Sequence, residues 1–162
     1  MYRKRDVLQS IGDATHEGFA PFVKASDFFT MGSCHQLALA LVSAIDGASF
    51  VAIYDHAGEH GGETETPRLV HAAAKIGNRI LDIEDFIAEP IWIDAWSDLA
   101  RDANFVEYEP GELPFEFISP AHQSFSERTA ALLADHWEKE IAAIMADTPV
   151  CRLQTQSAMM AL

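Results

Sequence analysis

The stretch that decides the fold runs from residue 70 to residue 82 and reads Val-His-Ala-Ala-Ala-Lys-Ile-Gly-Asn-Arg-Ile-Leu-Asp. Its Gly77-Asn78 pair is a two-residue connection of the kind that joins the strands of a tight hairpin. Short runs rich in apolar residues lie on both sides of the pair and favour strands. We therefore predict an antiparallel hairpin with the strands Leu69–Ile76 and Arg79–Glu84.

The turn also sets the register of the hairpin. With two turn residues, Ile76 pairs with Arg79, and His71 lies opposite Glu84 and diagonal to Asp82. Because side chains alternate between the two faces of a strand, these polar residues share one face. A histidine beside a carboxylate is what a general base and its orienting group require. A solvated polar face carrying the same residues is the alternative interpretation.

Asp82 and Glu84 compete as the partner of His71. Glu84 is directly opposite, but its longer side chain loses more rotamer freedom when it is held in one geometry. Asp82 is shorter, lies nearer the turn and is flanked by Leu81 and Ile83. We favour Asp82.

A second candidate residue begins a helix. Ser33 stands at an N-cap position before an apolar run with helical periodicity from Cys34 to Ile45, and Asp46-Gly47 ends the run. A cysteine in the first helical turn faces unpaired N–H groups and the positive end of the helix dipole, which favour the nucleophilic thiolate. The alternative is a buried cysteine that fills the core. Two residues on, we expect Gln36 to be a surface amide.

The segment Gly-Ser-Cys-His-Gln-Leu-Ala-Leu-Ala-Leu (32 to 41) resembles the nucleophile helix of papain-like and transglutaminase-like cysteine enzymes, and residues 70 to 82 resemble their histidine and aspartate strands. The resemblance covers residues 30 to 84 and also fits small bacterial and phage proteins with this plan. It implies Cys34 as nucleophile, His71 as base and Asp82 as orienting group. Two positions depart from the families, since His35 replaces an aromatic residue and the histidine strand has alanine where a tryptophan is common.

The other patterns predict an α+β domain, with the nucleophile helix packed on a small antiparallel sheet and a long C-terminal helix. Small residues at Ala72–Ala74 would let that helix approach closely. We expect Trp92, Trp96 and Trp137, and a stripe on the last helix that includes Leu132, to be core. We expect one domain over 1–147 and a loose tail over 148–162. Further helices are predicted over 5–12, 94–103 and 124–145, the last opened by a Ser124/Glu127 capping box, and residues 20–29 are predicted to be irregular or partly helical. Strands are predicted over 48–54 and 104–108, an extended segment over 115–118 and a mobile loop over 55–67.

Composition excludes several classes of function. The chain of 162 residues carries 25 acidic and 11 basic residues, a net charge of -14, which disfavours direct binding to nucleic acid. No apolar run is long enough to span a membrane, and nothing resembles a signal peptide, so we expect a cytoplasmic protein. Cys34 and Cys151 form no disulfide framework. The histidines at 35, 56, 60 and 71 lack the spacing of a metal site, so we expect neither metal nor cofactor.

Together these observations predict a cysteine hydrolase or acyl transferase, of peptidase, amidase or deamidase type, acting through Cys34, His71 and Asp82. Its substrate would be a peptide or protein amide. The alternative is a non-catalytic acidic protein, such as a phage-encoded inhibitor, whose charge steers it to a basic partner.

Overall fold

The computed structural model describes residues 25–30, 32–57 and 63–147. Within these ranges the chain forms five helices and five strands, an α+β arrangement as predicted. In chain order the elements are α2 (Ala25–Thr30), α3 (Cys34–Ala44), β1 (Ser49–Ala57), β2 (Glu63–Ile76), β3 (Arg79–Leu81), β4 (Phe86–Ala88), α4 (Glu89–Ser97), β5 (Ala103–Tyr108), α5 (Pro120–His136) and α6 (Glu138–Asp147).

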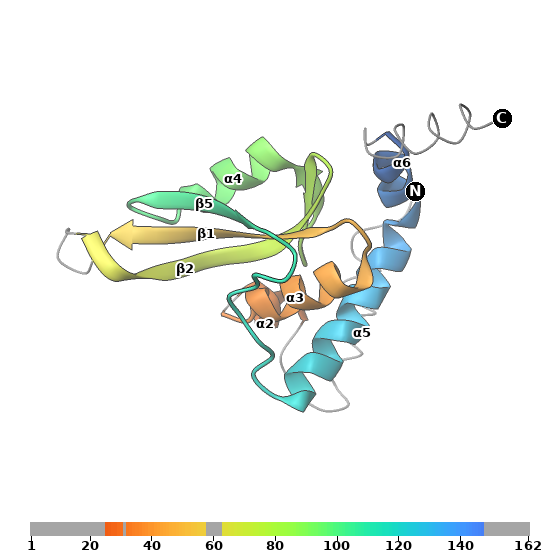
Figure 1. The fold of residues 1–162 in the computed structure, drawn as a ribbon, viewed down its shortest axis with the longest axis horizontal. Helices are drawn as coiled ribbons and strands as arrows, with labels where there is room; N and C mark the ends of the chain where they lie inside the picture. The colour runs from red at the N-terminus through yellow and green to blue at the C-terminus, as the bar shows by residue number, and fades with distance from the viewer. Residues whose placement is uncertain (1–24, 31, 58–62, 148–162) are drawn as a thin grey trace.

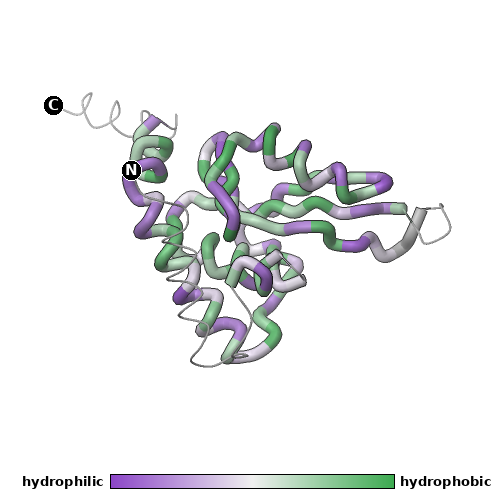
Figure 2. The backbone as a smooth tube through the Cα atoms, turned by 180° about the vertical axis from the view of Figure 1, so that it is seen from behind, coloured by the Kyte–Doolittle hydropathy of each residue, from purple (hydrophilic) through white to green (hydrophobic). Residues whose placement is uncertain are grey.

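The strands form one antiparallel sheet in the order β4-β3-β2-β1-β5. Helices α2, α3 and α5 cover one face of the sheet, and α4 covers the other (Figure 1). Hydrophobic residues follow the central strands, whereas hydrophilic residues recur along α5 and α6 (Figure 2). The sheet is therefore the middle layer of three, and both of its faces carry core residues.

The hairpin forms with the predicted register. Ile76 pairs with Arg79, and Ala74 pairs with Leu81. Gly77 has a φ of 59°, a left-handed conformation that glycine adopts without a steric penalty. A Cβ added there would also collide with Ile144 of α6, so glycine is needed both for the turn and for the packing of the last helix.

The second hairpin strand is shorter than predicted. It ends at Leu81, and the Asp82 side chain then accepts hydrogen bonds from the backbone N–H groups of Glu84 (2.8 Å) and Asp85 (3.0 Å). An aspartate that bonds the backbone just after it forms a turn in competition with the strand ladder. The predicted pairing of His71 with Glu84 is therefore not made, and Glu84 is exposed.

The predicted loop over 55–67 is wrong at both ends, because β1 continues to Ala57 and β2 begins at Glu63. The cause is Asp55, which is buried. Its carboxylate accepts hydrogen bonds from the backbone N–H of Ala57 (3.0 Å) and of Asp102 (3.1 Å), and it pairs with Arg68 at 3.3 Å. These contacts hold the strand ends together where composition alone indicated a loop.

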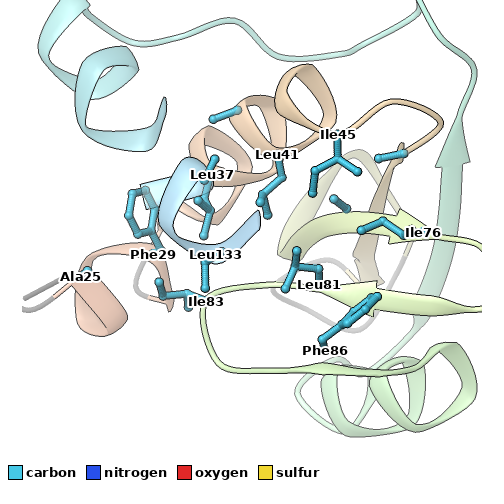
Figure 3. Close-up of a cluster of buried hydrophobic side chains, with 14 of the residues drawn as sticks. Ala25, Phe29, Leu37, Leu41, Ile45, Ile76, Leu81, Ile83, Phe86 and Leu133 are labelled. Atoms are coloured by element: carbon cyan, nitrogen blue, oxygen red, sulfur yellow. The ribbon is translucent and has the colours of Figure 1, made fainter. Parts of the chain in front are cut away.

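Helix α3 is the centre of the core. Every residue from Gln36 to Leu41 is buried, as expected for a helix that is packed on more than one side. Its apolar side chains meet Ile76 and Leu81 of the sheet and Leu133 of α5 (Figure 3). The alanines of β2 divide between the layers, with Ala72 and Ala74 packed on the α3 side and Ala73 on the α4 side.

Helix boundaries after the hairpin differ from the predictions. Helix α4 spans Glu89–Ser97 rather than 94–103, with Pro90 in its first turn, a position that proline favours. The last predicted helix is two helices, α5 and α6, and the N-cap of α5 is Ser119 rather than Ser124. The serine-proline pair at 119–120 was the stronger start signal.

Other expectations have mixed outcomes. The strand predicted over 104–108 forms over 103–108, whereas residues 115–118 form none. Trp92 is fully buried and Trp96 and Trp137 are partly buried, but Leu132 is 37% exposed. Across the described ranges no helix is long and apolar enough to cross a membrane. The predicted 5–12 helix and 148–162 tail lie outside the described residues.

Gln36 is a correction to the sequence analysis, because it is fully buried rather than a surface amide. Its amide N–H₂ donates to the carbonyl of Glu116 at 3.0 Å, and its amide oxygen accepts from the N–H of Ile118 at 2.9 Å. One side chain thus satisfies two backbone groups of the segment between β5 and α5 and holds that segment against α3.

We expect Gln36→Leu to destabilise the protein by about 2 kcal/mol, because two backbone groups lose their partner. Urea unfolding measures the free energy, and hydrogen exchange at the N–H of Ile118 should accelerate. Gln123→Leu on the exposed face of α5 is the control and should change stability by less than about 0.5 kcal/mol. Equal effects of the two substitutions would contradict the role of Gln36.

Candidate functional site

Cys34 is the first residue of α3 and is 4% exposed. Ser33 occupies the N-cap position, as predicted, and its side chain makes no cap hydrogen bond. Gly32 precedes it with a φ of 108°, so the chain enters the helix through a glycine conformation. The thiol packs in a small cluster with Ala38 and Ala72, where alanines leave room for the sulfur.

His71 lies on β2 and is fully buried. Its ring stacks on Trp96 of α4, with ring centroids 3.6 Å apart and an interplanar angle of 17°. The Nε2 atom of His71 is 3.2 Å from Oδ2 of Asp82. The histidine and the aspartate that the sequence analysis paired are therefore in contact, and the partner is Asp82 rather than Glu84.

The Asp82 carboxylate takes part in four hydrogen bonds. Oδ2 accepts from Nε1 of Trp92 (2.8 Å) in addition to its contact with His71, and Oδ1 accepts from the N–H groups of Glu84 and Asp85. A buried carboxylate is stable when its lone pairs are satisfied in this way. Asp82 thereby fixes the orientation of the His71 ring.

Cys34 and His71 approach from different layers. Cys34 packs on the α3 side of the sheet, whereas the His71 ring rests on α4. β3 pairs with β2 only from Ala74 to Ile76, so no β3 residue lies beside His71. The edge of β2 is uncovered by β3 at this point, and the two side chains meet there. The two side chains line one small space together with Asp82 and Phe29.

The interaction shifts the pKa of both groups. Burial raises the pKa of the Cys34 thiol, but hydrogen bonds with His35 and His71, the charge of His71 and the backbone of Ala72 outweigh it and lower the pKa from 9.0 to about 6. Burial lowers the pKa of His71, but Asp82 and Cys34 outweigh it and raise the pKa from 6.5 to about 9. Both shifts have the same consequence, since they favour a thiolate and an imidazolium over a neutral thiol and a neutral imidazole.

Asp82 stays ionised beside this pair. Burial raises the pKa of its carboxyl group, while the contacts with His71 and Trp92 lower it, and the net direction is down. The charges alternate along the row: a negative sulfur, a positive ring and a negative carboxylate. That order stabilises the central imidazolium and, through it, the thiolate.

The space beside the sulfur has no room for a water molecule, so the site is closed in this conformation. A larger pocket of about 300 Å³ lies on the α4 side, between Trp96 and the turn at Asp82, Glu84 and Asp85. Asp82 lines both spaces, whereas Cys34 lines only the small one.

Comparisons with known proteins identify no relative: no family model, no curated protein and no solved structure matches the chain. In the ranges that the structure describes, no group of three or more histidine, cysteine, aspartate or glutamate side chains is arranged so that it could hold a metal ion. His60 and Cys151 lie outside those ranges.

The sequence analysis did not predict that three further residues belong to the site. Trp92 and Trp96, which contact Asp82 and His71, were assigned only to the core. Their spacing of four residues on one helix face was a usable signal. His35, which contacts the thiol, was noted only as a departure from the families and as a potential metal ligand.

We expect alkylation of Cys34 by iodoacetamide, in a Cys151→Ser background, to have a pH midpoint near 6. Asp82→Asn should raise that midpoint by roughly one unit, because a neutral amide no longer holds the proton on His71. Initial alkylation rates across pH measure the midpoint.

Glu84→Gln is the matched control for Asp82→Asn, since Glu84 is exposed and only its backbone N–H contacts Asp82. It should leave the midpoint unchanged. A midpoint near 8.5 in the unmutated site would contradict the thiolate assignment altogether.

Proposed function

We propose that the protein is a cysteine hydrolase or acyl transferase that acts on amides through Cys34, His71 and Asp82. The observation that carries the proposal is the buried row of thiol, imidazole and carboxylate, in which the Nε2 of His71 is tied to Asp82. A base that contacts the nucleophile and is oriented by a third group is the arrangement that nucleophilic catalysis requires.

The chemistry follows from the charges of the pair. The Cys34 thiolate attacks the carbonyl carbon of an amide, and the electron pair of the C=O bond moves to the oxygen. In this proposal the backbone N–H groups at the start of α3 stabilise that oxyanion, because the first N–H groups of a helix have no partner within it. The His71 imidazolium then gives its proton to the leaving nitrogen as the C–N bond breaks, and a thioester remains.

The second half of the reaction restores the site. Neutral His71 accepts a proton from water, or from another acceptor that carries a hydroxyl or amine, as it attacks the thioester carbon. The C–S bond breaks, and the thiolate and imidazolium form again. Asp82 contributes by keeping Nε2 of the ring occupied, so that Nδ1 is the nitrogen available on the Cys34 side.

The proposed class agrees with the resemblance to papain-like and transglutaminase-like enzymes. A nucleophile on the first residue of a helix, a histidine on a later strand and an aspartate next to it are the features these enzymes share. We accordingly propose that α3 and the antiparallel sheet form a papain-like core. Supporting this assignment are the position of Cys34 at the start of α3 and the antiparallel pairing of β2 with β3.

The test is incubation with a panel of aminocoumarin amides, isopeptides and glutamine peptides, with release of coumarin or ammonia as readout. We expect turnover that rises as pH passes about 6 and falls as pH passes about 9, because it needs both the thiolate and the imidazolium. Intact mass should show an acyl adduct on Cys34.

Cys34→Ala should abolish turnover and the adduct, and His71→Gln should reduce turnover by at least about 100-fold. Cys151→Ser is the matched control for loss of a thiol and should leave turnover unchanged. Turnover that survives Cys34→Ala would overturn the proposed function.

A further inference from the structure

The pocket of about 300 Å³ on the α4 side of the sheet has no part in the reaction proposed above. Its volume is at the lower end of the range of about 300–1,000 Å³ for ligand pockets, so it suits one side chain or one small molecule. One of its walls is apolar and aromatic. Trp92, Trp96 and Leu99 line it at spacings of four and three residues, as on a single helix face, and Leu99 is 61% exposed.

The facing wall of the pocket is acidic. Asp82, Glu84 and Asp85 line it from the turn that follows β3. The Asp82 carboxylate is occupied by the four hydrogen bonds described above, and Oδ1 of Asp85 accepts from the N–H of Phe86 at 2.9 Å. Glu84 is exposed, and its carboxylate pairs with no cation of the described residues. The carboxylate of Glu84 can therefore bind a ligand without breaking a contact of the fold.

None of the described residues that line the pocket is basic. Arg68 bonds the carbonyl of Leu99 at 3.3 Å, but its charge is paired with Asp55. Arg79 donates to the carbonyl of Phe86 and lies over the ring of that residue. The pocket thus keeps its negative charge, in a protein whose net charge of -14 attracts basic partners.

Trp96 separates the pocket from the candidate catalytic site. One face of its indole stacks on the His71 ring, with centroids 3.6 Å apart, so the other face or the edge of the indole lines the pocket. The positive charge of His71 has partners of its own, the Asp82 carboxylate and the Cys34 sulfur. The remaining surface of Trp96 can therefore receive a second cation, since indole faces attract cations.

The combination of an aromatic wall and a carboxylate favours guanidinium over ammonium. A guanidinium group is planar, stacks on indole, pairs with carboxylates through two N–H groups and is less strongly hydrated than an ammonium group. We propose that the pocket binds an arginine side chain of a peptide or protein partner, with the guanidinium between Trp96 and Glu84 and the alkyl stem against Leu99. The inference goes beyond the proposed function and does not require Cys34 to react.

The test is isothermal titration calorimetry of the full chain with the peptide acetyl-Gly-Arg-Gly-amide. We expect a Kd on the order of 1 mM, because one side chain supplies the contacts. The same peptide with citrulline in place of arginine has the same shape without the charge and should bind at least about tenfold more weakly. The lysine peptide should bind about threefold more weakly. Raising NaCl from about 0.05 M to about 0.5 M should weaken the arginine complex.

Two variants locate the binding site. Glu84→Gln should raise the Kd of the arginine peptide about fivefold, because it removes the charge that faces the guanidinium. Glu140→Gln on α6 makes the same change of charge at an exposed residue outside the pocket and should leave the Kd unchanged. Ala95 is exposed and lines the pocket, so Ala95→Phe should fill it and abolish binding.

Three results would overturn the inference. Equal binding of the arginine and citrulline peptides would remove the role of charge, and a lysine peptide that binds as tightly as the arginine peptide would remove the choice of guanidinium. Equal effects of Glu84→Gln and Glu140→Gln would show that only the net charge attracts the peptide. If Ala95→Phe does not fold, as judged by circular dichroism, the comparison of the two glutamine variants decides.

The inference and the proposed function can fail separately. Cys34→Ala should bind the arginine peptide as tightly as the parent protein, because Cys34 does not line the pocket. Arginine binding in a protein that turns over no amide would leave this inference standing and remove the proposed function. Turnover that depends on Cys34, together with no binding of the arginine peptide, would do the reverse.

Discussion

The carboxylate of Asp82 is the constraint on which the rest of the site depends. It ends β3, forms the turn toward β4, binds the indole of Trp92 on α4 and orients His71 on β2. Placing one negative charge in the interior is expensive, and here four donors compensate the cost. The same bonds that make the charge tolerable also join the sheet to α4, so the stability of this region and the orientation of the ring have a common origin.

The short length of β3 has a matching effect on the opposite layer. A longer strand would pair with β2 past Ala74 and cover the edge at which the sulfur contacts the backbone of Ala72. The aspartate that stops the strand thus leaves open the place where α3 can present its first residue. The side chain of Cys34 on the α3 side and the ring of His71 on the α4 side then meet at this edge of β2.

Much of this arrangement followed from the sequence, because the hairpin is local. A two-residue turn fixed the register of β2 and β3, and the helix start at Cys34 followed from the apolar periodicity after it. The preference for Asp82 over Glu84 rested on its shorter side chain, on its position nearer the turn between Leu81 and Ile83, and on the family resemblance. The structure adds the reason that the Asp82 turn removes Glu84 from the ladder altogether.

What the sequence did not predict depends on distant contacts. Burial of Gln36 requires the segment at 116–118, which is separated from it by 80 residues or more. Asp55 looked like a loop residue because its partners, Arg68 and Asp102, come from two other parts of the chain. The predicted helix began at Asp94, five residues after the observed start of α4 at Glu89, because Asp94 was interpreted as the cap and Pro90 was not used as a start signal. A local sequence pattern predicts hydrogen bonds between residues that are close in the chain, whereas the positions of Gln36 and Asp55 depend on hydrogen bonds with distant residues.

The closed space around the sulfur has a consequence for the lifetime of the protein in an oxidising cell. Oxidation of cysteine by peroxide requires a thiolate that the oxidant can touch. Here the thiolate is chemically ready but enclosed by Phe29, Leu37 and the strand edge, with no room for water. Peroxide must therefore wait until this space opens, and under the function proposed above that opening is the same one that a substrate needs.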